Sequence, residues 1–173
     1  MTLISKTLNF SKLEHPQILL EQFFMKKSTC MDNYESIKEM NVEYKDDVIY
    51  SSYLYQYKPG NMKWLGILVK ETFFKQLLCF MNQSIIDLPH HRIDFIIRDE
   101  KNEIYSIGGF ISLEKSQEGY EGHLEIQKFE IFLTSMIPTW IKIKICEHIL
   151  YRIETDLLYF YSRLSLSNHP LQI

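Results

Sequence analysis

Alanine is missing from this 173-residue chain, and arginine and glycine are scarce, with four and six residues. Scarcity of these three residue types beside abundant Ile, Lys, Phe and Tyr is typical of an AT-rich coding region. We therefore attribute it to mutational bias rather than to a structural demand. Motifs built on Gly, Ala and Arg are easily eroded in such a chain, so their absence carries less weight than usual.

Cysteine is too sparse and too scattered to build a metal centre or a disulfide framework. Cys30, Cys79 and Cys146 lie far apart and form no C-x-x-C pair, so we expect reduced thiols in a cytoplasmic protein with no metal site. No apolar run approaches the roughly 18 residues of a membrane span, and residues 1–25 show no secretion signal. The net charge is −3 and no basic block is present. We therefore expect neither a nucleic-acid nor a membrane partner.

Apolar and aromatic side chains are what the chain has in abundance. It is 46% hydrophobic and contains eleven Phe, eleven Tyr and two Trp, which suffices for a core without cross-links. No repeat and no Pro/Gly/Ser-rich linker divides residues 1–173. We therefore predict a single α+β domain, with a central mixed or antiparallel sheet flanked by helices.

Apolar periodicity places the elements of this domain. It predicts strands over residues 3–10, 48–57, 92–99, 103–113, 123–133 and 157–166. It predicts helices over residues 15–26, from 62 or 70 to 81, and 138–156, whereas residues 28–46 are polar and poorly periodic. Leu124 and Ile126 occupy even positions of their strand, but Phe129 and Ile131 occupy odd ones. This change of parity predicts a β-bulge near residues 127–128.

Familiar catalytic motifs are absent from the sequence. It has no nucleophile elbow, Walker loop, dinucleotide fingerprint or H-E-x-x-H. We favour structural roles for all six histidines; Glu147 and His148, for example, point about 100° apart on a helix and cannot chelate one ion. Glu125 and Glu130 are a candidate carboxylate pair if the bulge brings them to one face of the strand. The favoured interpretation of both is a solvated strand charge.

From residue 92 onward, the order of hairpin, bulged strand, helix, strand and Asn resembles the core of the GNAT superfamily of N-acyltransferases. The stretches that carry the resemblance are Asn102–Leu113, Glu125–Leu133, Ile145–Leu150 and Leu164–Asn168. Residues 138–144 contain no glycine where that family has a Q/R-x-x-G-x-G/A loop, and the sequence ends before the family's last helix and strands. The resemblance therefore implies a degenerate acyltransferase.

The resemblance also implies a chemistry and a set of site residues. Acetyl-CoA would donate its acyl group to an amine, with Glu130 or Glu125 acting as the general base. Strand amides near residue 132 would polarise the thioester carbonyl, and lysines at the helix start would supply charge to the pyrophosphate. The implied cofactor contacts are Phe132, Leu133, Lys142, Lys144 and Asn168.

The alternative function is a non-enzymatic protein-binding module, such as a toxin-neutralising immunity protein or a small inhibitor. Mild acidity, the lack of a catalytic signature and many tyrosines favour this alternative, because tyrosine is common at interfaces. The partner would bind through residues 50–57. Four tyrosines lie there on one predicted strand, which suits pairing with an edge strand of another protein.

Overall fold

A seven-stranded antiparallel sheet and one long helix dominate the computed structural model, which describes residues 3–25, 34–132 and 137–167. The strand order is β1-β7-β6-β5-β4-β3-β2, so only the β1–β7 pair joins strands that are distant in the chain. The strands are β1 (Ile4–Ser11), β2 (Tyr34–Lys45), β3 (Val48–Tyr57), β4 (Cys79–Asp87), β5 (Arg92–Asp99), β6 (Tyr105–Lys115) and β7 (Gly119–Ile131). The helices are α1 (Pro16–Met25), the 3-10 turn η2 (Pro59–Met62), α2 (Lys63–Leu68), α3 (Glu71–Leu78) and α4 (Thr139–Ser167).

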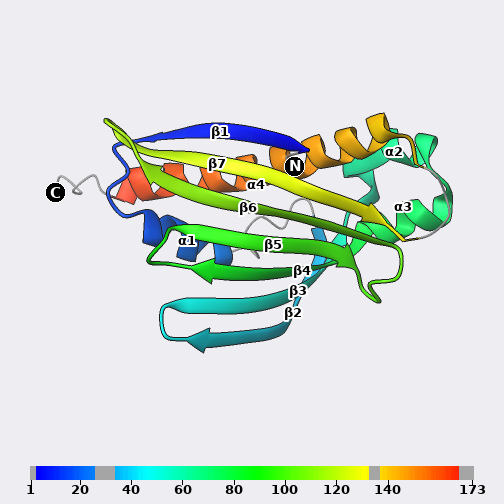
Figure 1. Cartoon of the computed structure of the whole chain (residues 1–173), viewed down its shortest axis with the longest axis horizontal. Coiled ribbons are helices and arrows are strands. Elements are labelled where there is room, and N and C mark those ends of the chain that lie inside the picture. Colours follow the sequence, from blue (N-terminus) through cyan, green and yellow to red (C-terminus); the bar gives the residue numbers. More distant parts are fainter. Residues whose placement is uncertain (1–2, 26–33, 133–136, 168–173) are drawn as a thin grey trace.

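The helices cover one face of the sheet (Figure 1). α4 runs along that face, and α2 and α3 lie at one end of the molecule's long axis. α1 packs against the C-terminal half of α4, where the rings of Phe23 and Phe160 meet edge to face at 6.4 Å. The predicted fold class, a single α+β domain with an antiparallel sheet flanked by helices, is confirmed.

Packing rather than local propensity holds α4 in place. The predicted stripe of isoleucines faces the sheet, with Ile141 and Ile145 buried and Ile149 and Ile153 packed against the core. The stripe continues beyond residue 156 through Leu157 and Phe160, which are 0% and 1% exposed. Each such side chain contributes about 1.5–3 kcal/mol on burial, so the apolar face anchors the helix along most of its length.

The predicted bulge in β7 is confirmed. Gly108 pairs with Lys128 but Gly109 pairs with Ile126, so Gln127 is the extra residue. A Cβ on Gly109 would lie 2.1 Å from the carbonyl oxygen of Glu125, so only glycine allows the two strands to approach this closely. Because of the bulge, Ile126 and Phe129 both point into the core despite their different parity.

The elements differ from the sequence-based expectation in three places. The second helix does not reach residue 81, because α3 ends at Leu78 and β4 begins at Cys79. Residues 157–166 are not a strand but the C-terminal part of α4. The unassigned segment 28–46 contains the edge strand β2. The other predicted strands and the helix over 15–26 are confirmed within a few residues, although residues 26–33 and 133 lie outside the described part of the chain.

Within the described residues, none of the helices combines the length and the apolar character that crossing a membrane requires.

Asp99 closes the hairpin between β5 and β6. It is only 2% exposed, and its carboxylate accepts hydrogen bonds from the backbone N–H groups of Glu103, Ile104 and Tyr105 at 3.0–3.1 Å. Burial by itself raises the pKa of Asp99, but these hydrogen bonds outweigh it and hold the pKa below its ordinary value. The charged carboxylate therefore stabilises this turn.

We expect Asp99→Asn to lower the free energy of unfolding by about 1–3 kcal/mol at pH 7, because an amide oxygen cannot satisfy three backbone donors as a carboxylate does. Because the folded-state pKa of Asp99 is depressed, its carboxylate contributes fully to stability above the unfolded-state pKa of about 4. That stabilisation is lost as the pH falls through the folded-state pKa. Urea unfolding at several pH values measures it, with exposed Glu100→Gln as the control. A difference between wild type and D99N that does not shrink below pH 4 would contradict this role.

Candidate functional site

A cavity lies between α4 and the face of the sheet that α4 covers. Its volume is about 110 Å³, several times the roughly 10–15 Å³ that one water molecule needs. Strands β3 to β6 supply about half of its lining residues, and α4 supplies most of the others. Single residues of α1, β2, η2 and α3 complete the walls. Apolar side chains dominate the lining, including Phe95, Ile97, Ile107, Ile111 and Ile145.

A few polar side chains converge on one part of the cavity wall. Tyr57, at the end of β3, makes a 3.0 Å hydrogen bond between its hydroxyl and Nε2 of His148. Arg152 and Asp156 form an ion pair on α4, with Nη2 and Oδ1 3.9 Å apart. Asn82, from β4, faces the same space. The cavity therefore combines an apolar body with a small polar region, which is the usual composition of a small-molecule site.

The spacing of residues on α4 explains this arrangement. His148, Arg152 and Asp156 follow one another at intervals of four, which places them on one side of the helix. The isoleucines 145, 149 and 153 have the same interval, and all six side chains line the cavity. α4 thus presents two adjacent stripes to the interior, one apolar and one polar.

Burial sets the charges in the polar region. It raises the pKa of Tyr57 to about 12, with smaller opposing effects from Arg152 and Asp156. Burial and the positive charge of Arg152 both lower the pKa of His148 below its ordinary value. At neutral pH Tyr57 is therefore protonated and His148 is uncharged. The guanidinium of Arg152 and the carboxylate of Asp156 balance each other, so this part of the wall has no net charge.

The tyrosines of β3 divide between the two faces of the sheet. Tyr55 and Tyr57 are 3% exposed and line the cavity, whereas Tyr50 is on the opposite face and 41% exposed. β3 pairs with β2 on one side and β4 on the other, so it has no free edge for a partner strand. A protein partner at residues 50–57 stays a prediction, but it would have to contact the outer face of the sheet.

The two candidate catalytic carboxylates lie away from the cavity. The bulge does bring Glu125 and Glu130 to one face of β7, but it is the face opposite to the one that buries Leu124 and Phe129. Glu125 accepts a 3.1 Å hydrogen bond from Gln127, and Glu130 pairs with Lys128 at 3.0 Å. Their contacts are those of solvated strand charges.

Three of the five candidate cofactor contacts lie within the described residues. The ammonium groups of Lys142 and Lys144 each lie 5.9 Å from a ring centroid, those of Phe129 and Trp64 respectively. Phe132 follows β7 and is 50% exposed. Leu133 and Asn168 lie outside the described residues. Their roles with acetyl-CoA were inferred from the family resemblance alone.

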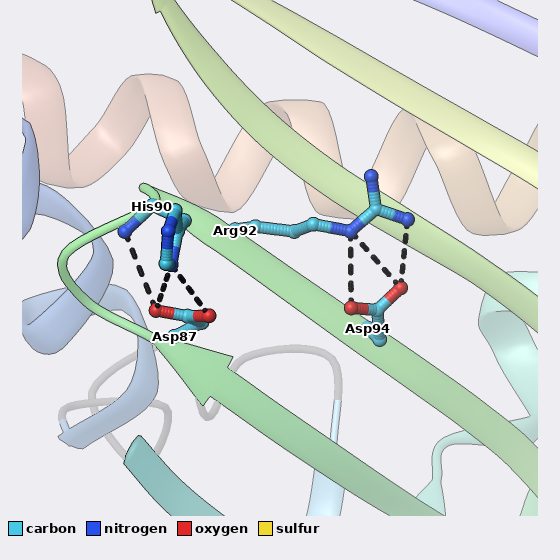
Figure 2. Close-up of polar contacts among 4 residues, drawn as sticks. All are labelled: Asp87, His90, Arg92 and Asp94. Carbon is cyan, nitrogen blue, oxygen red and sulfur yellow. Dashed lines mark hydrogen bonds and ion pairs between the residues drawn. The ribbon is translucent and has the colours of Figure 1, made fainter. Parts of the chain in front are cut away.

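His90 has a structural role at the turn between β4 and β5. Its Nδ1 lies 2.9 Å from both carboxylate oxygens of Asp87, and its backbone N–H donates to the same side chain (Figure 2). This contact lowers the pKa of Asp87. Arg92 turns away from it and pairs with Asp94, as Figure 2 shows. Among the described residues, no three His, Cys, Asp or Glu side chains gather as metal ligands would.

His148 and its neighbours were missed from the sequence. The sequence favours a structural role for His148, as for the other histidines, and places Tyr57 on a strand that suits a protein partner. Their contact joins residues 91 positions apart, which no local pattern reveals. One sequence pattern does point to the site: the polar residues 148, 152 and 156 have the same four-residue interval as the isoleucine stripe beside them.

Comparison with known proteins identifies the fold but no family. No protein-family model and no curated protein matches the sequence. Three solved structures are similar over most of their length. The Zhui aromatase/cyclase from a Streptomyces species has a TM-score of 0.56 and 9% identity, with 91% of this chain and 89% of that chain covered. Ara h 8.0201 has a TM-score of 0.55 and 10% identity, with 92% and 97% covered. An 18 kDa protein from Caulobacter crescentus has a TM-score of 0.53 and 10% identity, with 92% of each chain covered.

These likenesses show that the chain has the helix-grip fold, also called Bet v 1-like. The predicted resemblance to the GNAT superfamily is wrong, and with it the interpretation as a degenerate acyl-CoA-dependent acyltransferase. The physical reason is the continuous α4, which fills the place of the predicted final helix and strand. The roles given to Glu125 and Glu130 depended on that resemblance and no longer have a fold to support them.

We expect His148 to make stability fall as the medium is acidified. Because its folded-state pKa is below the ordinary value, its contribution is complete above about pH 6.5 and is lost as the pH falls towards the folded-state pKa. Thermal unfolding between pH 7.5 and 5 should show a shallower loss in His148→Gln, which keeps a polar group near Nε2. Exposed His15→Gln should retain the wild-type slope. Coincident slopes for wild type and H148Q would contradict a buried, neutral His148.

Proposed function

We propose that this protein binds a small, neutral and largely apolar molecule in the cavity, with a hydroxyl or carbonyl group of the ligand against Tyr57 and His148. The observation that carries the proposal is an apolar cavity of about 110 Å³ whose few polar groups converge on one part of its wall. Empty apolar cavities of comparable size, about 150 Å³, bind benzene. A single aromatic ring therefore suits this space.

The charge balance of the polar region supports a neutral ligand. Asp156 already neutralises Arg152, and the neighbouring Tyr57 and His148 are uncharged at pH 7. A ligand carboxylate would enter without a free counter-charge and would lose its hydration, which costs several kcal/mol. A hydroxyl or carbonyl group costs far less to desolvate. The bond to His148 uses one hydrogen-bonding position of the Tyr57 hydroxyl, and the hydroxyl has a further position for the ligand.

Structures of the same fold are compatible with this proposal. The Zhui protein is named an aromatase/cyclase, and so is the di-domain protein StfQ from the steffimycin biosynthetic pathway. Each of these two proteins is 9% identical to this chain. The shared fold supports a function based on the cavity, whereas the chemistry of the ligand follows from the residues of this chain.

Filling the cavity tests where the ligand binds. Ser84 is 5% exposed and lines the cavity, so we expect Ser84→Leu to occupy part of the free volume and weaken the binding of p-cresol at least tenfold. Isothermal titration calorimetry measures the affinity. The matched control is Ser112→Leu, on the outer face of β6, which should leave the affinity unchanged. Equal affinity in both variants, with both folded by circular dichroism, would place any ligand site elsewhere.

The Tyr57 hydroxyl tests how the ligand is recognised. We expect wild type to prefer p-cresol over toluene and to bind 4-methylbenzoate least, because only p-cresol offers a neutral hydrogen-bonding group. Tyr57→Phe should reduce the preference for p-cresol over toluene by about two- to tenfold, the equivalent of one hydrogen bond. Tyr50→Phe, on the outer face, is the control. A preference for 4-methylbenzoate in wild type would overturn the neutral-ligand assignment.

A further inference from the structure

One end of the molecule exposes large apolar side chains that the core does not use. Ile67 is 86% exposed, and Leu68, Trp140 and Ile143 are 40–51% exposed. The first two close α2, and the other two belong to the first turns of α4. We call these four residues the apolar tip. Exposed apolar groups gathered in this way mark a surface that contacts a partner or a membrane.

The two halves of the apolar tip lie close together. The Lys144 ammonium on α4 lies 5.9 Å from the ring centroid of Trp64 on α2. A crevice of the surface is lined by Leu68 and Lys70 on one side and by Pro138 and Ile141 on the other. Figure 1 shows α2, α3 and the start of α4 at the same end of the molecule's long axis. The exposed side chains of α2 and α4 therefore lie at one end of the molecule, where a single partner surface could contact both helices.

Lysines surround the apolar tip. Lys63, Lys70 and Lys144 are exposed beside it, although the whole chain has a net charge of −3. α2, α3 and the first three turns of α4 contain two acidic residues, Glu71 and Glu147. Glu71 pairs with Lys75 at 3.1 Å. Residues 63–78 and 139–149 thus carry five lysines and two glutamates, while the β5–β6 turn at the same end of the molecule adds Glu100 and Glu103 beside α3. The positive charge is therefore confined to α2, the start of α3 and the start of α4, where the apolar tip lies.

We propose that this end of the protein docks on the surface of an anionic lipid bilayer. Ile67, Leu68 and Ile143 would enter the boundary between headgroups and acyl chains, and Trp140 would lie at the headgroup level, where tryptophan is favoured. The three lysines would face the anionic headgroups, to which each cation adds attraction. This proposal replaces the sequence-based expectation that the chain has no membrane partner.

Docking at this end would bring the membrane near the cavity. His148 lines the cavity on one side, and on the other it lines a surface crevice with Trp64 and Lys144. Because His148 borders both spaces, an apolar ligand would pass beside it between lipid and cavity. This route rests on the proposed function, whereas the docking itself does not.

Co-sedimentation of the full chain with vesicles tests the docking, without any ligand added. We expect binding to vesicles of phosphatidylcholine with 30% phosphatidylglycerol at about 0.1 M salt, and much weaker binding to phosphatidylcholine alone. Ile67→Asn and Trp140→Ser should each weaken binding about tenfold, because each removes one inserted side chain. The double variant Lys70→Gln/Lys144→Gln should weaken it by about fivefold for each charge.

Matched variants at the opposite end provide the controls. Tyr44→Ser removes another exposed ring, and Lys45→Gln/Lys115→Gln removes the same charge from the β2–β3 and β6–β7 turns. Both should bind vesicles as wild type does. The proposal is overturned by an absence of binding to anionic vesicles, or by equal losses in the tip and control variants. A dimer in sedimentation velocity that I67N dissolves would also overturn it, because the apolar tip would then bind a second copy of the chain.

Discussion

The structure depends on how one long helix covers a sheet that is too wide for it. A helix with its side chains is about 10–12 Å across, whereas seven strands spaced about 4.8 Å apart span roughly 29 Å. α4 therefore covers only part of the sheet, and α1 and α3 must cover further strands beside it. Where these helices do not meet over the middle strands, the volume that remains is the cavity. The empty space follows from the geometry of the layers.

The residues around this space do not suit a protein built for stability alone. Filling it with larger apolar side chains would gain packing energy, and replacing a buried ion pair by apolar groups is often neutral or stabilising. The chain instead places Arg152 and Asp156 on the cavity wall, with Tyr57 and His148 beside them. Arg152 pairs with Asp156, and Tyr57 hydrogen-bonds to His148. These contacts offset the cost of burying the polar groups, so the fold tolerates them. They nevertheless give an otherwise apolar space a defined hydrogen-bonding region, which is what recognition of a small molecule requires.

The sequence revealed those parts of the fold whose pattern is local. The parity change between Ile126 and Phe129 was enough to predict the bulge, because a strand alternates strictly and one extra residue is the simplest correction. β2 was missed because it is an edge strand that is exposed on both faces, so its residues do not alternate. β4 was missed because Met81 extends the apolar pattern of α3 across the junction at Cys79. The site was missed for a different reason: Tyr57 and His148 meet only when β3 and α4 pack together.

The resemblance to an acyltransferase depended on the conformation of the ten residues 157–166. If Leu157 begins a strand, as its aromatic and apolar neighbours suggest, then the helix before it ends at Asp156 and the order of elements matches an acyltransferase core. Yet Leu157, Phe160 and Leu164 also lie three and four residues apart and extend the stripe of Ile149 and Ile153. Continuing a helix that is already formed costs less than starting a new strand at its end, because each added residue gains a backbone hydrogen bond without a new nucleus. The continuous helix reaches α1 and β1, buries Phe160, and holds Arg152 and Asp156 over the sheet. The resulting site is a cavity between α4 and the sheet, whereas an acyltransferase core would have opened a cleft between splayed strands.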